Sequence, residues 1–279
     1  MAYKSLMTVL TSAETIDATL AAAIELARRQ DAHLEVLCLG IDRTQAGYYY
    51  AGAAIVLQQE MLDRAEEDAR ALDAKVQARL AREDIRWSSE AAVAQLGALN
   101  GLVAIRARFN DLVVLPKPFG PGRSLEDEAI VEAALFEGQT PVLVLPERGL
   151  GESLGKRVVV AWNQSSEALN AVRQSLPMLR AAEVVDIAVV DPSQHGPERS
   201  DPGGPLSQML ARHGVRAEVS VLAKTLPRVS DILMRHVHDR DADLLVMGAY
   251  GHSRFREAIL GGATRAMLES AEVPVFMAH

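Results

Sequence analysis

Residues 243–279 read DLLVMGAYGHSRFREAILGGATRAMLESAEVPVFMAH, and the rest of the chain is organised around this stretch. An apolar run, Leu244–Met247, enters a glycine turn, Gly248-Ala-Tyr-Gly251, and nine residues later Gly261-Gly262 opens an amphipathic segment that closes on Val273–Met277. The pattern predicts a strand, a glycine turn, a helix start and a second strand. Glycines let backbone N–H groups point into one concavity, and a helix N-terminus adds unpaired donors and the positive end of a dipole. The stretch therefore predicts an anion site of the nucleotide type.

The spacing Gly248-x2-Gly251-x9-Gly261 resembles the ATP-binding signature of the universal stress protein family, and the framing strands match that family too. The resemblance covers nearly the whole chain, because tandem members of the family carry two such domains end to end. It implies two doubly wound α/β domains, each a five-stranded parallel sheet with helices on both faces, similar to adenine nucleotide alpha hydrolases. One position departs from the signature: Gly262 stands where the family usually has Ser or Thr. The backbone donor is kept and the hydroxyl is lost, and Thr264 is the candidate substitute.

Length and composition suit a globular protein of two domains. The 279 residues suffice for two domains of about 140 residues each. With 49% hydrophobic and 24% charged residues, substantial cores are expected. A net charge of −8 argues against a nucleic-acid or anionic-membrane surface. No apolar stretch approaches the ~20 residues of a membrane span, and the N-terminus does not have the pattern of a secretory signal. We therefore expect a cytoplasmic protein, with the single Cys38 packed in a core.

Strands and helices alternate in the same order in both halves, which predicts parallel sheets covered by helices. The polar, glycine-rich connection Pro146–Lys156 is the expected linker, so the predicted domains are residues 1–147 and 156–279. A long helix is expected over residues 53–82 and an irregular loop over residues 192–205. The expected strands cover residues 4–11, 33–39, 85–91, 111–115 and 141–145 in the first half, and 157–162, 184–191, 215–222, 243–247 and 273–277 in the second.

The two halves differ most at the predicted anion site. Counting back from the proline that opens each fifth strand places Glu128-Ala129 opposite Gly261-Gly262, with Glu126-Asp127 alongside. Carboxylates at this place would repel a triphosphate, and the three prolines of the turn 116–122 remove N–H donors. The first half is therefore predicted to be a non-binding or differently binding copy.

In the second half, the resemblance places a nucleotide across the carboxyl ends of strands one, two and four, as open α/β sheets generally do. Arg254, inside the nine-residue spacer, is a candidate for neutralising phosphate charge, or else a solvated loop residue. The family often has Asp where Asn163 stands, so the neutral amide argues against bound magnesium and against hydrolysis. The remaining ligand-binding candidates are Ala161, Val189, Val190, Met247, Gly248, Gly251, Gly261, Gly262 and Thr264.

The sequence contains no motif for a nucleophilic or metal-dependent enzyme. The chain contains no G-x-S-x-G, no H-E-x-x-H and no cysteine pair, so no catalytic residue and no metal site are predicted. The two imidazoles of His236-x-His238 would point about 200° apart on a helix. Trp162 either packs at a strand end or stacks on a base. The run Tyr48-Tyr49-Tyr50 either covers a sheet edge or lines a second ligand cleft.

These observations predict a cytoplasmic universal stress protein that binds ATP or another adenine nucleotide in its second half. Its expected role is that of a stress-response sensor or scaffold without efficient turnover. Two alternatives stay open: an interaction or dimerisation protein of the same fold that binds no nucleotide, and a slow ATPase. The resemblance also implies that the two fifth strands pair in an intrachain pseudo-dimer, and a further homodimer is left open. Neither a nucleic acid nor a membrane is an expected partner.

Overall fold

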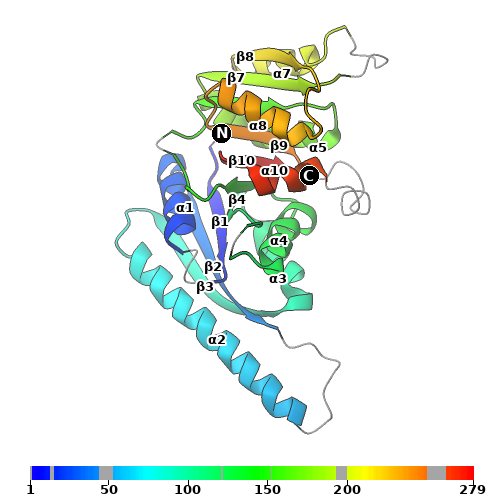
Figure 1. Ribbon diagram of the computed structural model, residues 1–279. Helices are drawn as coiled ribbons and strands as arrows, with labels where there is room; N and C mark the ends of the chain where they lie inside the picture. Colours follow the sequence, from blue (N-terminus) through cyan, green and yellow to red (C-terminus); the bar gives the residue numbers. More distant parts are fainter. Residues whose placement is uncertain are drawn as a thin grey trace. The chain divides into compact units, whose positions relative to one another are not determined.

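The computed structural model describes residues 2–12, 16–43, 53–120, 122–151, 153–192, 200–249 and 262–279. The chain forms two compact units, drawn in Figure 1. The N-terminal unit comprises Ala2–Pro116 and Ser124–Thr140, and the C-terminal unit comprises Lys117–Arg123 and Pro141–His279. The short segment Lys117–Arg123 therefore belongs to the C-terminal unit, although the residues before and after it in the chain belong to the N-terminal unit.

The N-terminal unit has a parallel sheet in the order β3-β2-β1-β4. Its inner strand β1 is buried on both faces, as a parallel sheet covered by helices requires. The strands are β1 (Ser5–Leu10), β2 (His33–Asp42), β3 (Arg86–Gln95) and β4 (Leu112–Pro116). The helices are α1 (Ile16–Gln30), α2 (Ala53–Leu80), α3 (Leu99–Ala107) and α4 (Leu125–Glu132), with a 3₁₀ turn at Leu96–Ala98 and a π-helical turn at Ala133–Glu137.

The long helix α2 runs along β2 and β3 (Figure 1). Its buried residues recur at helical spacing, and Gly40 of β2 allows it to come close, because an added Cβ would lie 2.0 Å from the carbonyl oxygen of Ala65. Cys38 of the same strand is buried, as expected. Burial, followed by the nearby Asp73 charge, raises the pKa of its thiol to about 12, so the thiol is not a reactive nucleophile at neutral pH.

The C-terminal unit has a six-stranded sheet in the order β5-β10-β9-β6-β7-β8. Five of these strands are parallel, and β5 pairs antiparallel with β10. The strands are β5 (Val142–Leu145), β6 (Arg157–Ala161), β7 (Val184–Val190), β8 (Ala217–Leu222), β9 (Leu244–Gly248) and β10 (Val275–Ala278). The described helices are α5 (Ser166–Gln174), α6 (Leu176–Ala181), α7 (Gly204–Arg212), α8 (Val229–Asp239) and α10 (Ala263–Ser270).

The expected α/β class, with parallel sheets and helices between successive strands, is confirmed. The antiparallel pairing of β5 with β10 brings together the two fifth strands, with Phe276 opposite Leu143 and both side chains fully buried. Because of this pairing, β5 belongs to the C-terminal unit, although it follows the N-terminal elements in the chain.

Several element boundaries differ from the expectation. The third strand, β3, continues to Gln95, because its pairing with β2 extends to Asp42. The segment between β6 and β7 does not form one continuous helix, because it is divided into α5 and α6 at Ser175, two residues before Pro177. Helix α7 begins at Gly204, inside the expected loop 192–205. Among the described helices, none combines the length and the apolar character that a membrane span needs.

Candidate functional site

The carboxyl ends of β6, β7 and β9 meet at one edge of the C-terminal sheet. Strand β6 lies between the other two: Ala161 pairs with Ala188 of β7, and Val160 pairs with Val246 of β9. Because all three strands are parallel, their last residues reach the same edge. The structure therefore brings together six of the predicted ligand-binding residues, Ala161, Asn163, Val189, Val190, Met247 and Gly248.

Asn163 is exposed and takes part in the turn that begins α5. Its Oδ1 accepts a hydrogen bond from the backbone N–H of Ser165 at 3.1 Å. Ser165 is the N-cap residue, and its hydroxyl accepts from the backbone N–H of Ala168 at 3.1 Å. Gln164 adopts a left-handed φ of 64° within the turn. The asparagine thus has a local structural role, typical of short polar side chains at helix starts.

Glu167, in the first turn of α5, has a carboxyl whose pKa is lowered. Burial would raise the pKa of its carboxyl. Hydrogen bonds from its own backbone N–H and from the hydroxyls of Ser165 and Ser166 outweigh burial and lower that pKa. The charged carboxylate is stabilised near the positive end of the helix dipole. The negative charge of Glu167 therefore offsets the positive end of the α5 dipole.

Gly248, the first glycine of the motif, has a packing reason to be glycine. A Cβ at this position would lie 2.5 Å from the backbone nitrogen of Ala168 and 2.7 Å from the carbonyl carbon of Glu167. Real Cβ atoms do not approach backbone this closely, so any side chain would push α5 away from β9. Sequence reasoning assigned this glycine to the ligand; the structure adds a packing reason for it, and its ligand-binding role stays a prediction.

The start of α10 is different, because its N-cap residue provides no side-chain cap. Gly262 is the N-cap residue, and the first intrahelical bond runs from the N–H of Ala266 to its carbonyl oxygen at 3.1 Å. The first turn contains no acidic residue. Thr264 is 3% exposed, so its hydroxyl is buried in the unit. The proposal that this hydroxyl replaces the one lost at Gly262 stays a prediction.

Gly251, Arg254 and Gly261 lie outside the described residues, as does the run Tyr48–Tyr50. What the sequence predicts for these residues therefore stays a prediction. On the described side of the motif, Val189 and Met247 are buried, with exposed fractions of 4% and 6%.

Trp162 follows β6 directly and is 9% exposed. Its backbone N–H donates to the carbonyl oxygen of Ala188 at 2.9 Å, which extends the pairing of β6 with β7. The indole Nε1 is buried and has no hydrogen-bond partner in the described part of the chain. Of the two expectations for Trp162, packing at a strand end is the one that its burial favours.

The equivalent place in the N-terminal unit is filled by the protein itself. Helix α4 begins with a capping box, in which Asp127 accepts from the backbone N–H of Ser124 at 2.8 Å. Glu126 is buried and pairs with Arg43 at 2.6 Å, just after β2. The remaining hollow has a volume of about 10 Å³, which is about the room for one water molecule. It is lined by Val9, Thr11, Leu115, Pro116, Asp127 and Ile130.

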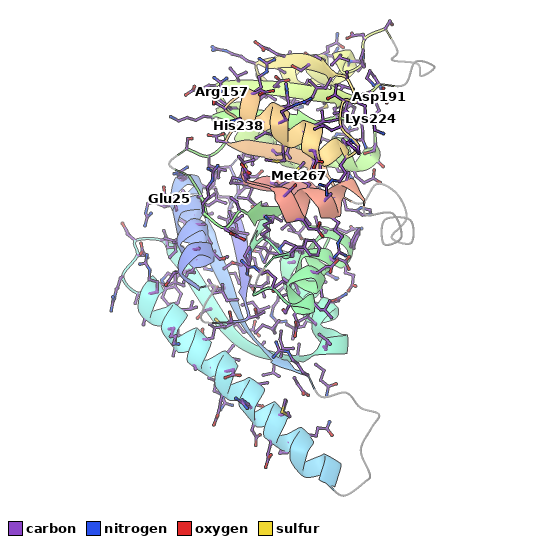
Figure 2. The ribbon with its side chains drawn as sticks, in the orientation of Figure 1. Glu25, Arg157, Asp191, Lys224, His238 and Met267 are labelled. Atoms are coloured by element: carbon purple, nitrogen blue, oxygen red, sulfur yellow. The ribbon has the colours of Figure 1, made fainter. Side chains whose placement is uncertain are left out.

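The two histidines of α8 lie on different sides of the helix, as helical geometry predicts. His238 is exposed (Figure 2), whereas His236 is buried and its Nε2 lies 3.2 Å from Oδ2 of Asp186. The same oxygen is contacted by Nε of Arg240 at 2.6 Å and by the hydroxyl of Ser220 at 3.0 Å. Within the described residues, no cluster of His, Cys, Asp or Glu is suited to a metal ion.

This buried network links α8 to β7 and β8, and sequence reasoning did not find it. Asp186 stands in the apolar strand sequence VVDIAVV, where a charged residue needs a partner because burial of an unpaired charge is costly. That isolated acid is the signal that could have revealed the network.

Comparisons with known proteins cover the two halves unequally. Residues 155–279 match the model of the Universal stress protein family. A universal stress protein of Synechocystis sp. is 30% identical over 89 residues, which are 32% of this chain. The chain spans only 30% of the length of that relative.

Two solved structures cover nearly the whole chain. A universal stress protein from Archaeoglobus fulgidus superimposes with a TM-score of 0.70 at 17% identity, covering 98% of this chain and 96% of the other. A functionally unknown protein from Pseudomonas aeruginosa gives a TM-score of 0.59 at 14% identity, covering 99% and 92%. These likenesses show that the fold is shared along the chain. The family model adds that residues 155–279 are similar to a domain of the Universal stress protein family.

Proposed function

We propose that this protein is a tandem universal stress protein that binds ATP or another adenine nucleotide in its C-terminal half. It would act as a stress-response sensor or scaffold without efficient turnover. The observation that carries the proposal is the start of α10. That helix begins at a bare glycine with no acid in its first turn, beside the carboxyl ends of three parallel strands. The positive end of its dipole suits a phosphate.

The N-terminal half is proposed to bind no nucleotide at its equivalent place. The first turn of α4 contains Glu126, Asp127 and Glu128, and Arg43 is engaged by the first of these. A polyphosphate would have to displace the ion pair and approach the remaining carboxylates. The hollow among the described residues there has a volume of only about 10 Å³. One competent site per chain is therefore expected, within the proposed domains 1–147 and 156–279.

The lack of efficient turnover is proposed from the chemistry of Asn163. A neutral amide is a weaker ligand for magnesium than the aspartate often found there in the family. The amide oxygen is also engaged by the N–H of Ser165. A phosphate-bound magnesium ion would thus have no carboxylate from this position, and no residue is proposed as a catalytic base.

Calorimetric titration of the full chain with ATP, with and without Mg²⁺, tests the proposal. The expected result is a stoichiometry near one per chain and micromolar affinity, which corresponds to about 8 kcal/mol. Two sites per chain would show that the N-terminal half binds as well. No binding at millimolar ATP would overturn the proposed function. Inorganic tripolyphosphate serves as a control for binding that involves charge alone.

A second candidate is an interaction protein that binds no nucleotide, and two observations favour it. Gly248 is explained by helix packing and Asn163 by the turn before α5, so neither residue requires a ligand. The pairing of β5 with β10 also supports an intrachain pseudo-dimer as a scaffold. Mass spectrometry of protein purified without added nucleotide separates the two functions, because only the first predicts retained adenine nucleotide.

A further inference from the structure

Two hydrogen bonds on Ala249 hold the end of β9 against the end of β10. The two strands pair in parallel, with Ala278 opposite Gly248. The backbone N–H of Ala249 donates to the carbonyl oxygen of Ala278 at 2.8 Å. The carbonyl oxygen of Ala249 lies 2.9 Å from Nδ1 of His279. Because a carbonyl oxygen can only accept, Nδ1 carries the proton and donates it to this bond.

The carbonyl of Ala249 requires a partner, because the residue is 0% exposed. A buried carbonyl oxygen without a hydrogen bond is costly, and buried backbone groups of folded proteins are therefore paired. In the described part of the chain, the imidazole of His279 provides that bond. His279 itself is exposed, so its side chain does not serve to fill the core.

The N-terminal half has the same backbone bond without an imidazole. There, Lys117 follows β4, and its N–H donates to the carbonyl oxygen of Leu145, the last residue of β5, at 3.0 Å. The next residue, at the place that corresponds to His279, is Pro146, which has no side-chain donor. The imidazole bond therefore belongs to the half of the chain that carries the glycine motif.

The two turns differ in stiffness, which gives a physical reason for the additional bond. Prolines stand at positions 116, 118 and 121 in the turn after β4, and each fixes its own φ. The motif after β9 begins instead with Gly248, and glycine loses more conformational freedom on ordering than any other residue. A bond that orders the start of the motif in advance reduces the entropy that ligand binding would otherwise cost.

We propose that His279 is a positioning residue of the nucleotide site, and that its imidazole holds the backbone of Gly248 and Ala249 in the conformation that receives the nucleotide. The inference rests on the proposed function and adds to that site a residue from outside the glycine motif. His279 acts through the carbonyl of Ala249, and no contact with the nucleotide is assigned to it.

The first test exchanges the donor at position 279. His279→Leu removes the donor and keeps a side chain of similar size, whereas His279→Asn retains a side-chain N–H. ATP should bind about two- to tenfold more weakly to His279→Leu, the effect of one hydrogen bond, and His279→Asn should recover most of the affinity. His238→Leu is the matched control, because it removes an exposed imidazole from α8 of the same unit (Figure 2) and should bind ATP like the wild type.

The second test measures the effect of the imidazole bond without nucleotide. The Ala249 amide should exchange with deuterium about two- to tenfold faster in His279→Leu than in the wild type, because its bond to Ala278 would open more often. The Trp162 amide, which donates to Ala188 in the same unit, is the internal reference and should exchange at the wild-type rate.

The outcomes separate the inference from the proposed function. Unchanged ATP affinity in His279→Leu, or an equal loss in His279→Leu and His279→Asn, would overturn the inference and leave the proposed function standing. Faster exchange at both Ala249 and Trp162 would show a general loss of stability and would also overturn the positioning role. A wild-type chain that binds no ATP would overturn the proposed function, and with it the assignment of His279 to a nucleotide site.

Discussion

Helices α4 and α10 occupy corresponding places in the two halves, and each has eight residues. Helix α4 begins at Ser124 with a capping box and three acids in its first turn. Helix α10 begins at Gly262 with no side-chain cap and no acid, and Arg265 lies in its first turn. One helix start is capped by its own side chains, whereas the N-cap residue of the other provides no side-chain cap.

A few residues are enough to reverse the electrostatic potential at corresponding helix starts of a repeated fold. The backbone at both places is a helix start after a parallel strand, which by itself attracts anions. Carboxylates on α4 cancel that attraction, and the ion pair with Arg43 closes the place. The glycine start of α10 preserves the attraction. Three experiments test whether the two helix starts differ in this way.

The largest effect is expected when the α4 residues are copied onto α10. The double substitution Gly261→Glu/Gly262→Ala should weaken ATP binding beyond detection by titration, because a carboxylate would face the phosphates and a Cβ would enter the helix start. Gly101→Glu is the control, since it adds the same charge at an exposed position in α3 with open space around it. Retained ATP affinity in the double variant would place the ligand elsewhere.

An intermediate effect concerns stability without any ligand. Gly248→Ala should lower the free energy of unfolding of the C-terminal unit by about 1–3 kcal/mol, because its Cβ would clash with α5. A Trp87→Phe background leaves Trp162 as the only tryptophan, so its fluorescence in urea reports on the C-terminal unit.

The matched control for Gly248→Ala is Gly101→Ala, within the helix α3. A Cβ at Gly101 would meet no atom within 4 Å, so alanine there should raise stability by about 0.5–1 kcal/mol. A Gly248→Ala variant as stable as the wild type would show that packing against α5 does not require this glycine.

The smallest effect is expected for the ion pair that closes the N-terminal place. Burial would raise the pKa of the Glu126 carboxyl, but hydrogen bonds from Ser124, Arg43 and its own backbone N–H, with the Arg43 charge, lower it overall. Glu126→Gln should cost about 1 kcal/mol at neutral pH, since Arg43 is 63% exposed and solvent screens the pair.

The pH dependence of this variant follows from the lowered pKa. A carboxyl with a folded pKa below its unfolded value stabilises the fold above the unfolded value, about 4.3, and this contribution is lost as the pH falls through the folded value. The stability difference between wild type and Glu126→Gln should therefore be largest near pH 7 and vanish in acid. Glu60→Gln, at an exposed position on α2, should show no such trend. A difference that is constant with pH would contradict the role of the ion pair.

Apolar periodicity and glycine spacing determined much of this protein without a structure. The alternation of strands and amphipathic helices sufficed to predict the α/β class, because each element must bury an apolar face. The acidic residues Glu126–Glu128 and the glycine at position 262 could also be identified from the sequence, since charge and side-chain size at a helix start depend on the local sequence. The contrast between α4 and α10 was therefore available before any coordinates.

Contacts between residues far apart in the sequence could be identified only from the three-dimensional structure. Gly248 packs against α5, eighty residues earlier in the chain, counting from Ala168. The pairing of Phe119 with Arg265 and of Asp186 with His236 likewise joins positions that no local pattern connects. The physical reason is the same in each case: a helix start, a strand end and a loop acquire their neighbours only after the sheet has brought them to one edge or one face.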